Sequence, residues 1–187
     1  MPLFRLGRAT LHTATSAEHL PRVGAVLVLG RQLRQRGLLL ELALGAELTA
    51  DVARWSRSRG VPLPSELDTL APRVAEIHGG LAREVACLMQ AHEQLVAAES
   101  WSSGPPFGLW RAKRELRVYK DFHGRLIEQL HPLRNDWRRM AEMYQDAVER
   151  RPKSLLLEAT LVTPSFIESI GQKIDAFGAP QGPSKKD

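Results

Sequence analysis

One pair of residues in the sequence has the spacing of a known metal-binding motif. Glu128 and His131 form a Glu-x-x-His sequence, which four-helix bundles use to bind a pair of iron ions. Such a centre needs the motif on two helices, and this chain contains it once. The pair also lies off the apolar stripe that Leu126, Leu130 and Leu133 would form on a helix. We therefore predict that both side chains face solvent and that the chain holds no metal and no cofactor.

A second candidate is His78-Gly79-Gly80, because adjacent backbone N–H groups can stabilise an oxyanion. It lies inside a predicted helix, however, and has no serine or cysteine nucleophile beside it. The single cysteine, Cys87, stands among apolar residues and is predicted to be buried and unreactive. Phosphate-binding glycine loops and a nucleophile elbow are absent from the sequence. The sequence predicts a protein that is not an enzyme.

Tryptophan and arginine are the residues that indicate interaction with a partner. Tryptophan is enriched at interface hot spots, although it also packs helix ends and cores. Clustered arginines bind phosphate backbones, although they also form ordinary solvated helix faces. A further basic cluster consists of Arg111, Lys113, Arg114 and Arg117. The interaction candidates are Trp55, Trp101, Trp110, Trp137, Arg31, Arg34, Arg36, Arg54 and Arg57.

Charge is distributed unevenly along a chain whose net charge is +5. Residues 1–60 contain nine arginines and four acidic residues, and residues 61–106 contain two arginines and six acidic residues. Residues 107–154 contain twelve basic and seven acidic residues. We expect the acidic segment to pair with the basic segment that follows it. That pairing would leave the basic N-terminal segment for an outside partner.

The apolar segment 20–60 is predicted to form two helices, over 21–36 and 38–58. Gly37 and Gly60 are suitable residues for their C-terminal ends. The alternative is a β-hairpin, since Val26 and Val28 favour strands, but leucine and alanine dominate the segment.

Two long apolar stripes follow, with spacings of three and four residues. The first is predicted to form a helix from Ser65 to Trp101, and the second a helix over 109–150, which at about 1.5 Å per residue would be about 60 Å long. The segment 102–108 is a turn. Pro132 lies within the second stripe, and we expect a kink there rather than a break.

These elements predict an all-α fold built on a long, coiled-coil-like antiparallel helical hairpin over 65–151. The N-terminal helical pair 20–60 precedes the hairpin. Short helices over 152–178 and a flexible tail over 179–187 follow it.

Residues 1–19 form either an ordinary basic arm or a mitochondrial targeting segment. The first 17 residues contain Arg5 and Arg8 and no acidic residue, together with apolar residues, serines and threonines. We therefore predict a mitochondrial location, with the cytoplasm as the alternative. No stretch of about 20 residues is free of charge, so we expect no transmembrane helix.

The sequence favours a non-catalytic structural or adaptor subunit of a larger protein assembly, such as a mitochondrial complex. The alternative is a helical subunit associated with nucleic acid, for example on the ribosome, through its arginine clusters. A third reading is a helical-bundle enzyme or metal carrier. Peripheral contact of residues 20–48 with a membrane surface is a further partner prediction.

Overall fold

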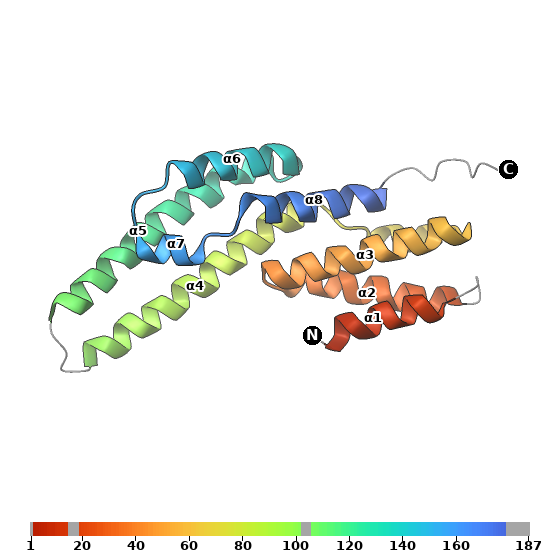
Figure 1. Ribbon diagram of the computed structural model, residues 1–187, viewed down its shortest axis with the longest axis horizontal. Coiled ribbons are helices and arrows are strands. Elements are labelled where there is room, and N and C mark those ends of the chain that lie inside the picture. Colours follow the sequence, from red (N-terminus) through yellow and green to blue (C-terminus); the bar gives the residue numbers. More distant parts are fainter. Residues whose placement is uncertain (1, 15–18, 102–105, 179–187) are drawn as a thin grey trace.

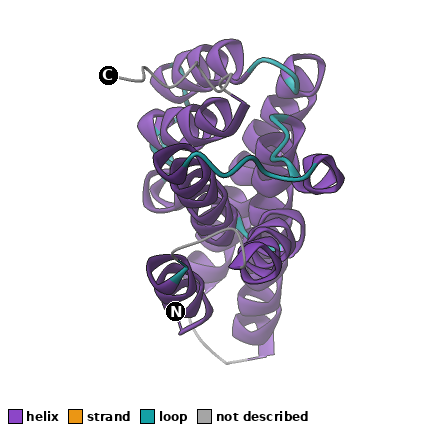
Figure 2. Ribbon diagram, turned by 90° about the vertical axis from the view of Figure 1, so that its right-hand side faces the viewer, coloured by secondary structure: helices purple, strands orange, loops and turns teal. Residues whose placement is uncertain are grey.

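The computed structural model describes residues 2–14, 19–101 and 106–178, and within these ranges every regular element is helical (Figures 1 and 2). The predicted all-α class is confirmed, and residues 20–48 are helices rather than a β-hairpin. No helix in these ranges is long and apolar enough to cross a membrane. The α-helices are α1 (Pro2–Thr13), α2 (Leu20–Arg36), α3 (Leu39–Arg59), α4 (Ala75–Trp101), α5 (Pro106–Leu130), α6 (Trp137–Glu149), α7 (Leu155–Thr160) and α8 (Pro164–Gly178).

The helices α1, α2 and α3 enclose the smaller of two apolar cores. Its buried residues include Leu11 from α1, Val26 and Leu27 from α2, and Leu48 and Val52 from α3. The described part of the N-terminal segment is therefore a helix packed on its neighbours and not an arm. The apolar side chains that suggested membrane contact for residues 20–48 are largely turned into the protein.

Two glycines let α2 and α3 approach closely. A Cβ atom on Gly45 would lie 2.5 Å from the Gly30 carbonyl oxygen, so only glycine fits there. The side chain of Arg34 passes through this contact and is fully buried. Its Nε donates to Glu76 Oε2 at 2.7 Å, its Nη2 to the Leu70 carbonyl at 2.7 Å, and its Nη1 to the Thr49 hydroxyl. Thus one guanidinium joins α2, α3, the 3₁₀ helix η2 (Ser65–Leu70) and α4.

The predicted helix from Ser65 to Trp101 is wrong at its beginning. Residues Ser65–Leu70 form η2, and α4 begins at Ala75. Pro72 explains the difference, because proline lacks the N–H of a helical hydrogen bond and disfavours helix in the residue before it. Beyond this point the predicted apolar stripe is confirmed as far as Leu88, with Ile77 and Leu81 buried in the larger core, whereas its last residue, Leu95, is exposed.

The helices α4 and α5 lie side by side and antiparallel, and their ends extend beyond the rest of the molecule (Figure 1). Part of the predicted turn, residues 102–105, lies outside the described residues, and Pro106–Gly108 already belong to α5. Gly80 of α4 packs against α3, where an added Cβ would meet Leu42 Cδ1 at 2.9 Å. The close approach of a neighbouring helix accounts for the glycine at this position in the second turn of α4.

The prediction of one helix over 109–150 is also wrong, because the chain breaks and reverses at Pro132. The helix α5 ends at Leu130, His131–Leu133 form the short helix η3, and α6 begins after Asp136. Asp136 caps α6 by accepting hydrogen bonds from the backbone N–H groups of Arg138 and Arg139, both at 3.2 Å. The apolar spacing survives the break because α6 folds back on α5 and buries Met140 and Tyr144 in the same core.

The C-terminal helices α7 and α8 complete the larger core, which contains residues of α3 to α8. The helix α7 lies on α5 and is held at its beginning by Ser154. The Ser154 hydroxyl donates to Glu115 Oε2 at 2.6 Å and accepts from the backbone N–H of Leu157. The helix α8 packs against α3 and α6. The predicted tail 179–187 lies outside the described residues.

Replacing Arg34 with methionine should lower the free energy of unfolding by about 3–5 kcal/mol, because Glu76 would remain half-buried without its cation. Urea unfolding of the full chain measures this. The matched control Arg36→Met, at an exposed position of the same helix, should change the value by less than about 0.5 kcal/mol. If Arg34→Met lowers the free energy of unfolding by less than about 1 kcal/mol, the buried ion pair contributes little to the stability of the fold.

Candidate functional site

The residues with motif-like spacing do not form a centre in the structure. Glu128 and His131 are exposed. His78 Nε2 lies 3.0 Å from the Ile127 carbonyl oxygen, and its ring lies edge-on to that of His131 at 5.4 Å. Within the described ranges, no three histidine, cysteine or acidic side chains are grouped as metal ligands. The prediction that Cys87 is buried is wrong: it is exposed, because it points away from the side of α4 that carries Leu81 and Val85.

Three of the nine interaction candidates are buried and unavailable to an outside partner, which corrects the prediction for them. Arg34 is held by the contacts given above. Trp55 donates its indole N–H to the Ala14 carbonyl at 2.7 Å, and Trp137 donates to Asp175 Oδ2 at 3.1 Å. Both rings therefore pack helices together within the chain. The side chain of Trp101 lies outside the described residues, and Trp110 is 63% exposed.

The remaining arginine candidates are near the surface of the N-terminal helices. Arg54 pairs with Glu47 at 3.2 Å and with Asp51. Arg57 donates to the carbonyl oxygens of Ala53 and Ala176. Arg31 is half-buried and Arg36 exposed, and neither forms an ion pair with a described side chain. The structure gives these four interaction candidates different surroundings.

Charge pairing differs in part from the sequence-based expectation. Glu47 and Asp51 each form ion pairs with Arg8 and Arg54, and Lys173 also pairs with Glu47 at 2.9 Å. Cations of the N-terminal segment are thus neutralised inside the chain. Between α4 and α5, the described side chains form one ion pair, Lys120 with Glu93. The exposed residues Arg111, Lys113, Arg114 and Arg117 form none with a described side chain.

The feature best suited to bind a partner is an apolar groove between the ends of α4 and α5, which we call the distal seam. It measures about 380 Å³. Leu95 and Leu155 at its sides are 58% and 60% exposed, which is unusual for large apolar side chains that lie together. Its lining consists of His92, Leu95, Val96, Ala112, Glu115, Leu155 and Leu156.

The distal seam is open because α7 covers only part of the surface of the α4–α5 pair (Figure 1). The hydrogen bond from Ser154 lowers the pKa of Glu115, against a smaller opposing effect of burial, and the backbone N–H of Leu156 also donates to this carboxylate. These bonds fix the beginning of α7 at Glu115. Leu157 is fully buried beneath α7, whereas Leu155, at the first position of the helix, borders the uncovered groove.

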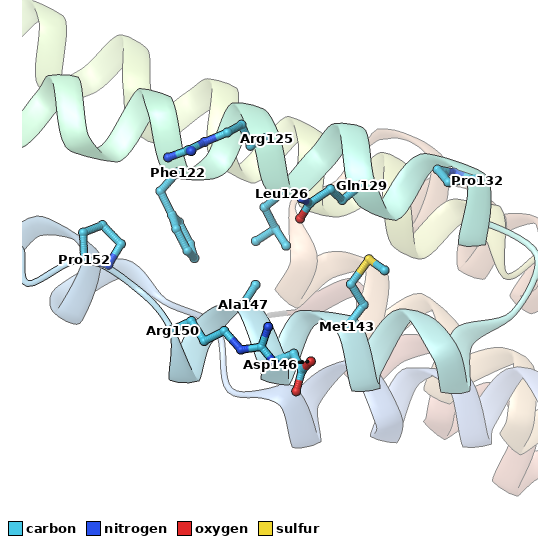
Figure 3. A pocket seen from close by; sticks show the side chains of 10 residues that line it. All are labelled: Phe122, Arg125, Leu126, Gln129, Pro132, Met143, Asp146, Ala147, Arg150 and Pro152. Carbon is cyan, nitrogen blue, oxygen red and sulfur yellow. Dashed lines mark hydrogen bonds and ion pairs between the residues drawn. The ribbon is translucent and has the colours of Figure 1, made fainter.

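A second groove of about 690 Å³ separates α5 from α6 (Figure 3). Phe122 and Leu126 point into it from α5, and Met143 and Ala147 point into it from α6. Arg150, the residue that follows α6, pairs with Asp146 at 3.2 Å. The lining is mainly apolar, with Arg125 and Gln129 as the polar side chains contributed by α5, and the groove can accept apolar groups.

A small cavity of about 10 Å³ adjoins three buried polar side chains of the larger core. Both ring nitrogens of His123 have no hydrogen-bond partner in the structure, and the hydroxyls of Tyr119 and Tyr144 approach Thr160 and the Val162 backbone without forming a well-aligned hydrogen bond. Burial lowers the pKa of His123 to about 4 and raises the pKa of each tyrosine to about 12. The volume suits about one water molecule, which would satisfy some of these atoms. It is too small for a substrate.

Acid should destabilise the protein through His123. Its folded-state pKa of about 4 lies below the unfolded value of 6.5. The unfolded chain therefore binds more protons, and stability is lost as the pH falls from 6.5 toward 4. Between about pH 7 and pH 4.5, urea unfolding should show the wild type losing about 2 kcal/mol more than His123→Leu. Equal losses would contradict a buried neutral histidine. The exposed variant His131→Leu is the control and should follow the wild type.

Protein-family models, curated proteins and solved structures were compared with this chain, and none matches it. The function must therefore be inferred from the surfaces described above.

Proposed function

We propose that the protein is a non-catalytic adaptor subunit that binds a helix of another subunit in the distal seam. The observation that supports this most directly is the pair of exposed leucines, Leu95 of α4 and Leu155 of α7, that line an open groove among α4, α5 and α7. Helix-in-groove binding places the apolar side of an amphipathic helix into such a groove.

The helix α7 provides an internal example of this kind of packing. It lies against α5 and buries Leu157 in the larger core. A partner helix would continue this arrangement toward the ends of α4 and α5, covering Leu95, Val96 and Ala112. Buried apolar surface contributes about 25 cal/mol per Å², so covering two exposed leucines favours association.

The charge beside the seam indicates the chemistry of the partner helix. Arg111 lies one helical turn before Glu115 on α5 and is exposed; its charge helps to lower the pKa of Glu115, but it forms no ion pair with a described side chain. Glu115 itself is occupied by Ser154 and Leu156. We therefore propose an occupant with an apolar stripe and an acidic residue opposite Arg111.

A double substitution in the seam tests the proposal. Leu95→Asp with Leu155→Asp should leave the fold intact, because both side chains are more than half exposed. It should release the protein from its assembly, since truncated interface hot spots cost about 2 kcal/mol or more. The tagged chain is purified from its native cells, and the mass and subunit composition are measured by light scattering and mass spectrometry.

The control is Leu40→Asp, because Leu40 is a comparably exposed leucine on α3, 56% accessible. We expect the wild type and this control to elute with the same stoichiometric partner and the double variant to elute alone. The proposal fails if the wild type is itself a monomer, if the double variant keeps the partner, or if the purified chain pairs only with a second copy of itself.

For the compartment, we propose the mitochondrion, with α1 retained in the folded protein. Arg5 and Arg8 on the amphipathic helix α1 support targeting. The packing supports retention of α1. The carbonyl of Ala14 accepts hydrogen bonds from the side chains of Trp55 and Arg59. In addition, Leu11 of α1 is buried in the smaller core.

A fusion of residues 1–19 to a fluorescent protein should enter mitochondria, and the full chain recovered from them should keep its intact mass. Replacing Arg5 and Arg8 with glutamine should abolish import of the fusion. A cytoplasmic fusion would contradict the proposed location, and a shortened chain would contradict retention.

A further inference from the structure

The side of α5 that faces away from the seam carries an exposed aromatic ring surrounded by cations. Trp110, Lys113, Arg114 and Arg117 are spaced three, four and seven residues apart, so they lie on one side of the helix. All four are exposed. We call this surface the Trp110 face.

The four residues of the Trp110 face include no acid, and the exposed Asp121 lies one helical turn beyond Arg117 on the same side of α5. Glu115 lies on the side covered by α7, where Ser154 and the N–H of Leu156 occupy its carboxylate. Lys113, Arg114 and Arg117 form no ion pair with any described side chain. By contrast, the arginines Arg8 and Arg54 of the N-terminal helices are paired with Glu47 and Asp51. The cations of the Trp110 face are thus available to an external anion.

The exposed ring adds a second kind of contact. Trp110 is 63% accessible, and the guanidinium carbon of Arg114 lies 5.7 Å from its ring centroid. Cation–π contact of this kind keeps the arginine beside the indole. Planar aromatic and guanidinium groups side by side are the groups on which an unpaired nucleobase stacks.

We propose that the Trp110 face binds single-stranded nucleic acid, with one base on Trp110 and phosphates on Lys113, Arg114 and Arg117. The face extends about 10 Å along the helix axis, which accommodates about two or three nucleotides. This surface is separate from the distal seam and does not depend on the proposed adaptor function.

A single-stranded nucleic acid fits the Trp110 face better than a duplex, an anionic membrane surface or an acidic peptide. A duplex keeps its bases stacked and would leave Trp110 unused. A membrane surface would attract the cations, but Trp110 is the one large apolar side chain among the four, so insertion into lipid would bury little apolar area. An acidic peptide would pair with the cations and gain nothing specific from the indole.

The experiment measures fluorescence anisotropy of labelled oligo(U) and oligo(dT) of about 12 nucleotides with the full chain, at about 50 to 200 mM salt. The double variant Arg114→Glu with Arg117→Glu should weaken binding at least about tenfold and reduce the slope of log affinity against log salt by about 1.4. The RNA and DNA arms distinguish the two sources of the strand.

A charge-matched control separates this site from general basicity. Arg22→Glu with Arg36→Glu changes the net charge equally at exposed positions on α2, and it should weaken binding less than about threefold. Trp110→Ala should weaken binding about five- to a hundredfold and leave the salt slope unchanged, because stacking releases no counterions.

Three results would overturn the proposal: no binding of either oligonucleotide at the lowest salt, equal loss in the control, or tighter binding to phosphatidylserine vesicles or polyglutamate than to the oligonucleotides. Leu95→Asp with Leu155→Asp should bind the oligonucleotides as the wild type does. This variant distinguishes failure of the adaptor function from failure of nucleic-acid binding.

Discussion

The buried guanidinium of Arg34 is the interaction on which the arrangement of the helices depends. A charge removed from water is tolerated only with a partner and hydrogen bonds for its donors, and Glu76, Thr49 and the Leu70 carbonyl supply them. These groups come from three other elements, so satisfying one side chain fixes how α2, α3 and α4 meet. Arg83 of α4 reinforces the junction by donating to the Arg34 carbonyl at 3.1 Å. The direction in which α4 leaves the N-terminal helices is therefore set at this point.

The surfaces proposed to bind partners follow from that direction. The ends of α4 and α5 lie side by side and extend beyond the other helices, which therefore cover only part of the α4–α5 pair (Figure 1). The helix α7 begins at Ser154, which is tied to Glu115, and the groove beyond it stays open. The same hydrogen bond holds the carboxylate of Glu115 on the side of α5 that faces α7. One side of α5 then carries an apolar groove, and the opposite side carries cations around Trp110.

Local sequence signals were reliable where short-range physics decides the outcome. Apolar spacing predicted the helical class, and glycine and proline placed the ends of α2 and α3 within one or two residues. Gly60 ends α3 in the left-handed conformation at a φ of 61°, which favours glycine. The errors arose at Pro72 and Pro132, where the spacing continued across a break. A periodic pattern does not distinguish one helix from two that bury their apolar sides in the same core.

The sequence by itself determined the helices, the absence of a recognisable catalytic motif, and the places where large aromatic and basic residues occur. Only the tertiary structure decided which of them are accessible. Arg34 and Trp137 are buried while Trp110 and Cys87 are exposed, although nothing in their immediate neighbours distinguishes them. The physical reason is that burial and charge pairing depend on residues distant in the chain. Arg34 meets Glu76, and Trp137 meets Asp175, across separations of 42 and 38 positions.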